Sequence, residues 1–193
     1  MPDSLGALAE GALDEIRGVF GRLAPGALDP VLDALAAAGR IVCHGVGREG
    51  LMMRALAMRL YHLGLDAHVV GDMSAPPVGS GDLLVASAGP GGFATVDGLM
   101  RVARDAGART LLFTAQPQGS AAILADTIFV LPGQTMADDM GANDTGPAAA
   151  SVLPMGSLYE GAQFLLFELV VLRLRDRLGV APEAMRARHT NLE

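Results

Sequence analysis

Apolar residues along this chain are grouped in two ways. Five short segments are largely apolar and rich in Val, Ile, Leu or Phe, as expected of strands that are covered on both faces. They predict strands at 40–44, 67–70, 82–87, 110–114 and 127–130. Elsewhere apolar positions recur at helical spacing and end at Gly or Pro, which stop helices. These segments predict helices at 4–23, 28–38, 50–63, 96–106 and 121–125, a long helix at 156–178 and a short one from residue 182.

The alternation of predicted strands and helices indicates the fold class. Strands that alternate with helical segments of about 10–15 residues are typical of βαβ units, and so of a parallel sheet. The sequence therefore predicts an α/β fold, and its 193 residues predict one domain spanning 1–193. Ligands in such folds bind beyond the carboxyl ends of the strands. Those ends are Gly45, Gly71, Ala88, Ala115 and Pro132.

Two segments in the C-terminal part depart from this alternation. Residues 133–155 hold several Gly, Asp and Ala, and a loop of this length predicts either a lid over a ligand or a mobile surface loop. Its Asp138, Asp139 and Asp144 lack the regular spacing of a metal-ligand set, so no metal site is expected. The segment 158–172 is apolar nearly all round, which indicates a helix buried on several sides. Packing between subunits would bury it, so the sequence predicts a homo-oligomer.

Composition and charge exclude several functional classes. The net charge is −7 with a pI near 5.0, and no basic cluster is typical of a nucleic-acid-binding surface. All 14 cationic side chains are Arg, which excludes a Schiff-base mechanism and a P-loop of the GK[ST] kind. The single Cys43 excludes an internal disulfide and a Cys-based zinc site. Without a signal peptide or an apolar stretch that could span a bilayer, the sequence predicts a cytoplasmic protein with no membrane partner.

Glycine-rich turns follow two of the predicted strands. The first glycine turn, residues 45–50, is Gly-Val-Gly-Arg-Glu-Gly, and the second glycine turn, residues 87–92, is Ser-Ala-Gly-Pro-Gly-Gly. Backbone N–H groups at such turns bind a compact anion, and Arg48 would add a forked contact. Two alternatives stay open. In the first alternative, each turn is a tight strand-to-helix connection that binds no ligand. In the second, the first turn, with its G-x-G-x-x-G pattern, binds a dinucleotide, and Asp72 binds the ribose.

Longer motifs carry a resemblance to a known family. Residues 45–50, 57–64 (Ala-Met-Arg-Leu-Tyr-His-Leu-Gly) and 79–84 (Gly-Ser-Gly-Asp-Leu-Leu) resemble the sugar isomerase (SIS) domain. Residues 154–160 and 188–193 are similar to 6-phospho-3-hexuloisomerases. The resemblance implies a three-layer α/β/α sandwich with a five-stranded parallel, flavodoxin-like sheet, in a homodimer or homotetramer. It also implies a sugar phosphate as the substrate, with 3-hexulose 6-phosphate and fructose 6-phosphate interconverted without a metal or an organic cofactor.

The resemblance also implies which residues bind the substrate and its phosphate. They are Gly47, Arg48, Glu49, Ser87, Gly89, Gly91, Gly92 and Thr114. Two features depart from the family pattern: Glu49 stands where the family has Ser, and the second turn lacks the hydroxyls of Ser-Gly-Ser-Gly-Glu-Thr that bind the phosphate. Pro90 also removes one N–H donor. A carboxylate repels a phosphate by about 1–4 kcal/mol at a separation of 4 Å. The lost hydroxyls favour a non-catalytic phosphosugar sensor as the alternative function.

Two further residues are candidates for the chemistry. Moving a carbonyl group between adjacent carbons needs a base that takes a proton from one carbon and returns it to the other. Glu160 matches the family's catalytic glutamate, although residues 157–160 also form an S-x-x-E capping box, which is the alternative role. His189 is a candidate for ring opening or substrate contact, because imidazole exchanges protons near neutral pH. In an oligomer its tail would reach a neighbouring site, and a solvated tail residue is the alternative.

Overall fold

A single parallel sheet organises the structure, a computed structural model that describes residues 4–139 and 151–192. Its five strands lie in the order β2-β1-β3-β4-β5. They are β1 (Ile41–Gly45), β2 (Ala67–Val69), β3 (Leu83–Ser87), β4 (Arg109–Thr114) and β5 (Thr127–Val130). Because β1 and β3 are hydrogen-bonded neighbours, with Gly45 paired to Ser87, the two glycine turns leave the sheet side by side.

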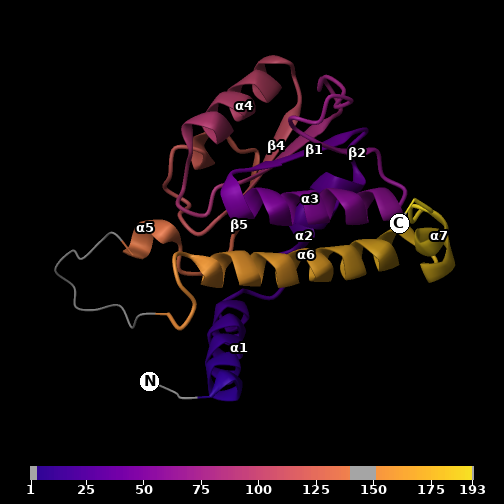
Figure 1. Ribbon diagram of the computed structural model, residues 1–193. Helices are drawn as coiled ribbons and strands as arrows, with labels where there is room; N and C mark the ends of the chain where they lie inside the picture. The colour runs from indigo at the N-terminus through magenta and orange to yellow at the C-terminus, as the bar shows by residue number, and fades with distance from the viewer. Residues whose placement is uncertain (1–3, 140–150, 193) are drawn as a thin grey trace.

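Helices cover both faces of this sheet (Figure 1). They are α1 (Leu5–Gly21), α2 (Asp29–Ala36), α3 (Gly47–His62), α4 (Ala94–Asp105), α5 (Met136–Asp139), α6 (Ser157–Leu178), α7 (Pro182–Ala187) and the 3₁₀ helix η1 (Ala122–Leu124). Helices α2, α3 and α6 lie on one face, and α4 lies on the other with η1 packed against it. The predicted three-layer α/β/α fold with a five-stranded parallel sheet is confirmed.

The apolar residues of the strands supply a core on each face of the sheet. The larger core lies between the sheet and α2, α3 and α6, where Phe113 of β4 packs edge-on against Phe167 of α6 with ring centroids 5.0 Å apart. The smaller core lies under α4 and contains Met100. Every residue of β3 is buried, as its uninterrupted apolar run predicts, whereas β2 is only half-buried because it forms an edge of the sheet.

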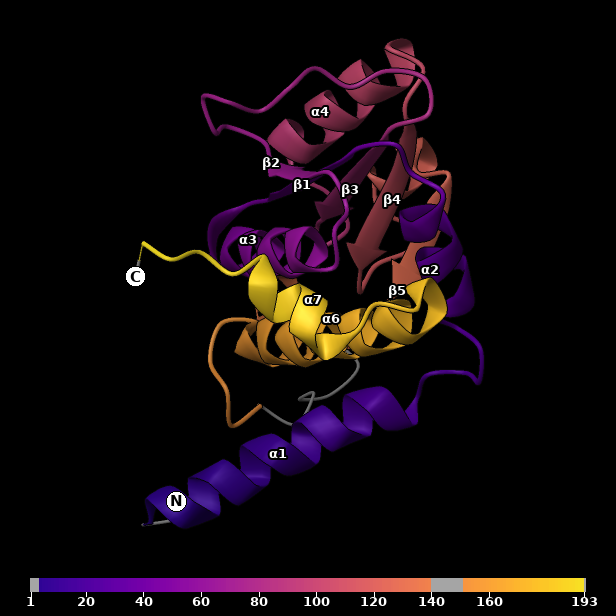
Figure 2. The ribbon, with the colours of Figure 1, turned by 90° about the vertical axis from the view of Figure 1, so that its right-hand side faces the viewer.

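The N-terminal helix begins where the sequence predicts. The hydroxyl of Ser4 accepts a hydrogen bond from the N–H of Ala7 at 3.2 Å, so Ser4 is the N-cap of α1. Helix α1 contacts α6 and extends away from the sheet layers (Figure 2). Its distal end therefore leaves Leu5 and Leu13 exposed.

Two boundaries differ from the prediction in a way that affects the site. Helix α3 begins at Gly47, three residues before the predicted start, because Gly47 adopts a positive φ of 58° that lets the helix start directly after the strand. The short helix α5 lies inside the segment predicted as a loop. The rest of that loop, residues 140–150 with Asp144, lies outside the described residues.

The described residues contain neither a cluster that could hold a metal ion nor a helix that could cross a membrane. No group of three or more His, Cys, Asp or Glu within 4–139 and 151–192 is placed to hold a metal ion. Over the same residues, none of the helices has the length and apolar character needed to cross a membrane.

Candidate active site

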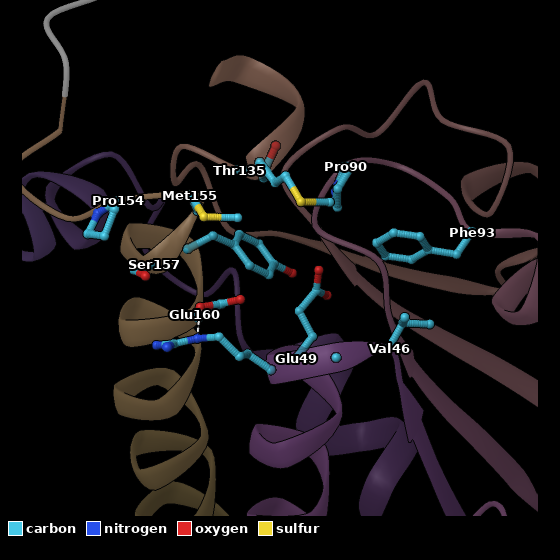
Figure 3. A pocket seen from close by; sticks show the side chains of 14 residues that line it. Val46, Glu49, Pro90, Phe93, Thr135, Pro154, Met155, Ser157 and Glu160 are labelled. Carbon is cyan, nitrogen blue, oxygen red and sulfur yellow. Dashed lines mark hydrogen bonds and ion pairs between the residues drawn. The ribbon is translucent and has the colours of Figure 1, made fainter. Parts of the chain in front are cut away.

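A cavity of about 340 Å³ lies beyond the carboxyl ends of β1 and β3 (Figure 3). Pockets that hold small molecules measure about 300–1,000 Å³. Its wall is formed by the start of α3, the second glycine turn, the start of α6 and the flanks of the long loop. The lining residues are Val46, Gly47, Arg48, Glu49, Pro90, Phe93, Thr135, Met136, Pro154, Met155, Gly156, Ser157, Tyr159 and Glu160.

Glu160 lies in the first turn of α6 and points into this cavity. Its side chain is 14% exposed, and its Oε2 accepts a hydrogen bond from Nε of Arg48 at 2.5 Å. Arg48 comes from α3, so this ion pair joins the two helices that flank the cavity. A carboxylate that is held in place and still reaches the solvent of the cavity can exchange a proton with a bound molecule.

The capping role that the S-x-x-E pattern offers for Glu160 is wrong. The N-cap of α6 is Gly156, which has a φ of 79°, a left-handed conformation that favours glycine. Ser157 is already the first helical residue, so its side chain is not at the N-cap position. No side-chain hydrogen bond caps this helix. Glu160 is therefore free to face the cavity rather than the helix end.

Glu49 lies opposite Glu160, and its carboxylate is buried. The N–H of Gly89 donates to both of its oxygens, at 3.1 and 2.9 Å, and the hydroxyl of Ser87 donates to Oε2. Burial raises the pKa of Glu49, the hydrogen bonds from Ser87 and Gly89 oppose that shift, and the charge of Glu160 adds to it. The first and second glycine turns are thus joined by a side chain of the protein itself.

Two polar residues of α6 belong to this cluster but were not predicted as site residues. Gln163 is fully buried and donates from Nε2 to Oγ of Ser87 at 2.6 Å, and its Oε1 has no partner among the described residues. The hydroxyl of Tyr159 lies 3.5 Å from the same Oγ. Burial, followed by the charge of Glu49, raises the pKa of Tyr159 well above its usual value. The available signal was their i, i+4 spacing as polar groups within an apolar helix.

Five of the eight predicted binding residues are not among those that line the cavity: Ser87, Gly89, Gly91, Gly92 and Thr114. Gly91 and Gly92 pack against the loop after β4, where a Cβ on Gly92 would lie 2.1 Å from Oγ of Ser120. Thr114 is buried, and its hydroxyl accepts a hydrogen bond from the N–H of Gln116 at 3.0 Å. Gly47, Arg48, Glu49, Ser87 and Gly89 are brought together at the cavity or directly behind it.

His189 lies at the other end of α6. Glu160 and the C-terminus of that helix are separated by about 27 Å at a rise of 1.5 Å per residue, and His189 follows beyond α7. Its ring lies 5.3 Å from the ring of His62 at a separate surface hollow. Within one chain the structure does not bring His189 to Glu160.

Comparison with known proteins places this geometry in a family. No family model matches the sequence. The chain is 34% identical over 180 residues to the 3-hexulose-6-phosphate isomerase of Mycobacterium gastri, covering 93% of this chain and 87% of that protein. It is 33% identical over 165 residues to the enzyme of the same name from Bacillus subtilis, covering 86% of each.

The chain belongs to the 3-hexulose-6-phosphate isomerase family. Its fold also matches a Methanococcus jannaschii protein, whose crystal structure was used to infer a 3-hexulose-6-phosphate isomerase function. That match has a TM-score of 0.79 and 25% identity, and it covers 98% of both chains. The family resemblance noted from the motifs is confirmed. Membership also argues against the dinucleotide alternative, whose ribose-binding candidate Asp72 pairs with Arg54 at 3.1 Å.

Proposed function

We propose that the chain is a phosphosugar isomerase that interconverts 3-hexulose 6-phosphate and fructose 6-phosphate, with Glu160 as the base. The observation that carries this proposal is the placement of the Glu160 carboxylate at the cavity of a chain that belongs to this family. The Arg48 guanidinium fixes the carboxylate at the cavity wall. An oriented carboxylate that faces a ligand-sized cavity supports proton transfer in the bound sugar.

The reaction moves two protons and needs one carboxylate base. In 3-hexulose 6-phosphate the carbonyl is at C3, and Glu160 takes the proton from C2. The electron pair of that C–H bond forms the C2=C3 double bond of an enediolate, whose negative charge lies on the former C3 carbonyl oxygen. The hydroxyl proton at C2 passes to that C3 oxygen, the C2 carbonyl forms, and the electron pair of the double bond takes the proton back from Glu160 at C3.

Solvent exchange at a single carbon tests this function. In deuterium oxide, the enzyme should replace the C3 proton of fructose 6-phosphate by deuterium, followed by ¹H NMR. An isomerase of the aldose–ketose type would exchange the C1 protons instead. Stabilisation by fructose 6-phosphate without any exchange would support the non-catalytic sensor, and neither binding nor exchange would refute both functions.

We also propose that the chain forms a homo-oligomer, as the apolar character of α6 predicts. Five large apolar side chains of α6 stay exposed in the single chain: Phe164, Leu165, Leu169, Leu172 and Leu178, of which Phe164 is 49% exposed. A solvent-exposed stripe of this kind on an otherwise buried helix favours a protein interface. The molar mass in solution, measured by light scattering, tests this proposal.

A further inference from the structure

The backbone donors of residues 88–91, in the second glycine turn, are already used within the chain. The N–H of Ala88 donates to the carbonyl of a β4 residue at 3.0 Å, and the N–H of Gly91 closes the turn by donating to the carbonyl of Ala88 at 2.9 Å. Pro90 has no N–H. The N–H of Gly89 donates to the carboxylate of Glu49. None of these four positions offers a donor to a ligand while Glu49 is in place.

The nearest hydroxyl is used in the same way. Gln163 donates to Oγ of Ser87 at 2.6 Å, so the hydroxyl proton of Ser87 is directed to its other partner, Oε2 of Glu49. Glu49 therefore accepts one backbone N–H and one hydroxyl hydrogen bond. These are the two kinds of donor that would otherwise bind an anion at this turn.

The charges of the cavity lead to the same conclusion. Of the described residues that line it, Arg48 is the cation, and Glu49 and Glu160 are the anions. Arg48 is paired with Glu160. The carboxylate of Glu49 is thus not neutralised by a cation in the lining, and a phosphate placed next to it would meet a like charge in a partly buried setting.

We propose that Glu49 is a specificity-determining residue that occupies the anion position of the cavity and competes with the substrate's phosphate for Gly89 and Ser87. The inference rests on the proposed function and concerns how its substrate is held. Phosphate binds at this turn only when Glu49 is displaced or protonated. The affinity of the enzyme for sugar phosphates is then limited by its own side chain, and removal of that charge improves the affinity.

Binding of fructose 6-phosphate to Glu49→Gln and Glu49→Ser tests the proposal. Gln keeps the size of the side chain and removes its charge, whereas Ser also removes its reach to Gly89. Isothermal titration calorimetry at pH 8 should give a Kd at least about fivefold lower in both variants than in the wild type, because about 1–4 kcal/mol of repulsion is removed and 1.4 kcal/mol is tenfold. Glu168→Gln is the matched control: it also removes one carboxylate, which pairs with Arg59 outside the cavity, and its Kd should equal that of the wild type.

The pH dependence supplies a second measurement that needs no variant. Among the described residues, the other titratable or charged groups that face the Glu49 carboxylate are Tyr159 and Glu160 of α6 and Arg48 of α3. The hydroxyl of Ser87, on β3, also contacts it. A phosphate monoester loses its second charge as the pH falls past about 6, which ordinarily weakens binding. Protonation of Glu49, whose pKa burial raises, acts in the opposite direction, so the wild-type Kd should decrease as the pH falls through the range in which Glu49 takes up its proton.

The outcomes separate this inference from the proposed function. A Kd in Glu49→Gln and Glu49→Ser within about twofold of the wild type would overturn the inference, even where C3 exchange occurs. Tight binding by both variants without C3 exchange in any protein would retain the inference and refute the isomerase function. If neither variant folds, a wild-type Kd that only rises as the pH falls would overturn the inference.

Discussion

Glu160→Gln is the substitution that separates chemistry from structure most cleanly. The amide keeps the size of the side chain and its place in the first turn of α6, and it can still accept a hydrogen bond from Arg48. It cannot take a proton from carbon at neutral pH. If Glu160 is the base, the variant keeps the fold and the cavity and loses the proton transfer.

The expected magnitudes follow from the exposure of the ion pair. The Arg48 side chain is 65% exposed, so solvent screens the pair, and its loss should lower the free energy of unfolding by at most about 1 kcal/mol. For a chain of this size, such a loss lowers the melting temperature by about 2–4 °C. Removal of a general base should lower the rate about 10²–10⁴-fold.

The assay pairs the rate of C3 deuterium exchange in fructose 6-phosphate with thermal unfolding of the same samples. Glu168→Gln serves as the control, because Glu168 lies on α6, as Glu160 does, and forms a partly exposed ion pair with Arg59 of α3. The reasoning is refuted if Glu160→Gln unfolds more than about 10 °C earlier yet retains the exchange rate per folded molecule. That result would make Glu160 a structural residue.

Four further substitutions or treatments have defined outcomes. Burial raises the pKa of Glu49 above 4.5, so the contribution of this group to the free energy of unfolding is fully present below pH 4.5 and is lost as the pH rises through the folded-state pKa. Thermal melts over this pH range should show the wild type losing stability relative to Glu49→Gln. Burial raises the pKa of the Cys43 thiol to about 12, so the folded protein should not react with a thiol reagent at pH 8, and denaturant should restore full reaction. Phe164→Asp should lower the molar mass in solution if the exposed side of α6 is an interface, and an unchanged mass would contradict that role. Deletion of residues 187–193 should raise KM or weaken assembly if the tail reaches a neighbouring site, and unchanged kinetics and mass would assign it to solvent.

The layers of the fold were predictable because burial on both faces leaves a direct trace in the sequence. The run 83–87 has no polar alternation, and every one of its residues is buried at the centre of the sheet. The strand at 67–69 has a weaker run and lies at the edge. Helix α3 begins three residues before the sequence predicts, because Gly47, with a positive φ, is already its first residue.

The site was predictable only in its location. Parallel strands bring their carboxyl ends to one edge, so the two glycine turns were expected to meet there. The hydrogen bond from Gly89 to Glu49 joins residues 40 positions apart in the sequence. It depends on how α3 packs, and the local sequence pattern does not contain that information. The S-x-x-E pattern at 157–160 suggested a cap, but the backbone conformation of Gly156 moved the start of the helix and left Glu160 facing the cavity.

The buried cluster around Glu49 shows how the two carboxylates of the cavity come to differ. Glu160 has a guanidinium partner and contact with solvent, whereas Glu49 has neutral donors and little solvent. Desolvation therefore acts mainly on Glu49, and the hydrogen bonds from Ser87 and Gly89 only partly offset it. A buried carboxylate whose charge has no cationic partner costs stability, and Glu49 has only the neutral donors Ser87 and Gly89. Under the two proposals the carboxylates have separate tasks: Glu160 moves the proton, and Glu49 sets which anionic group the cavity accepts.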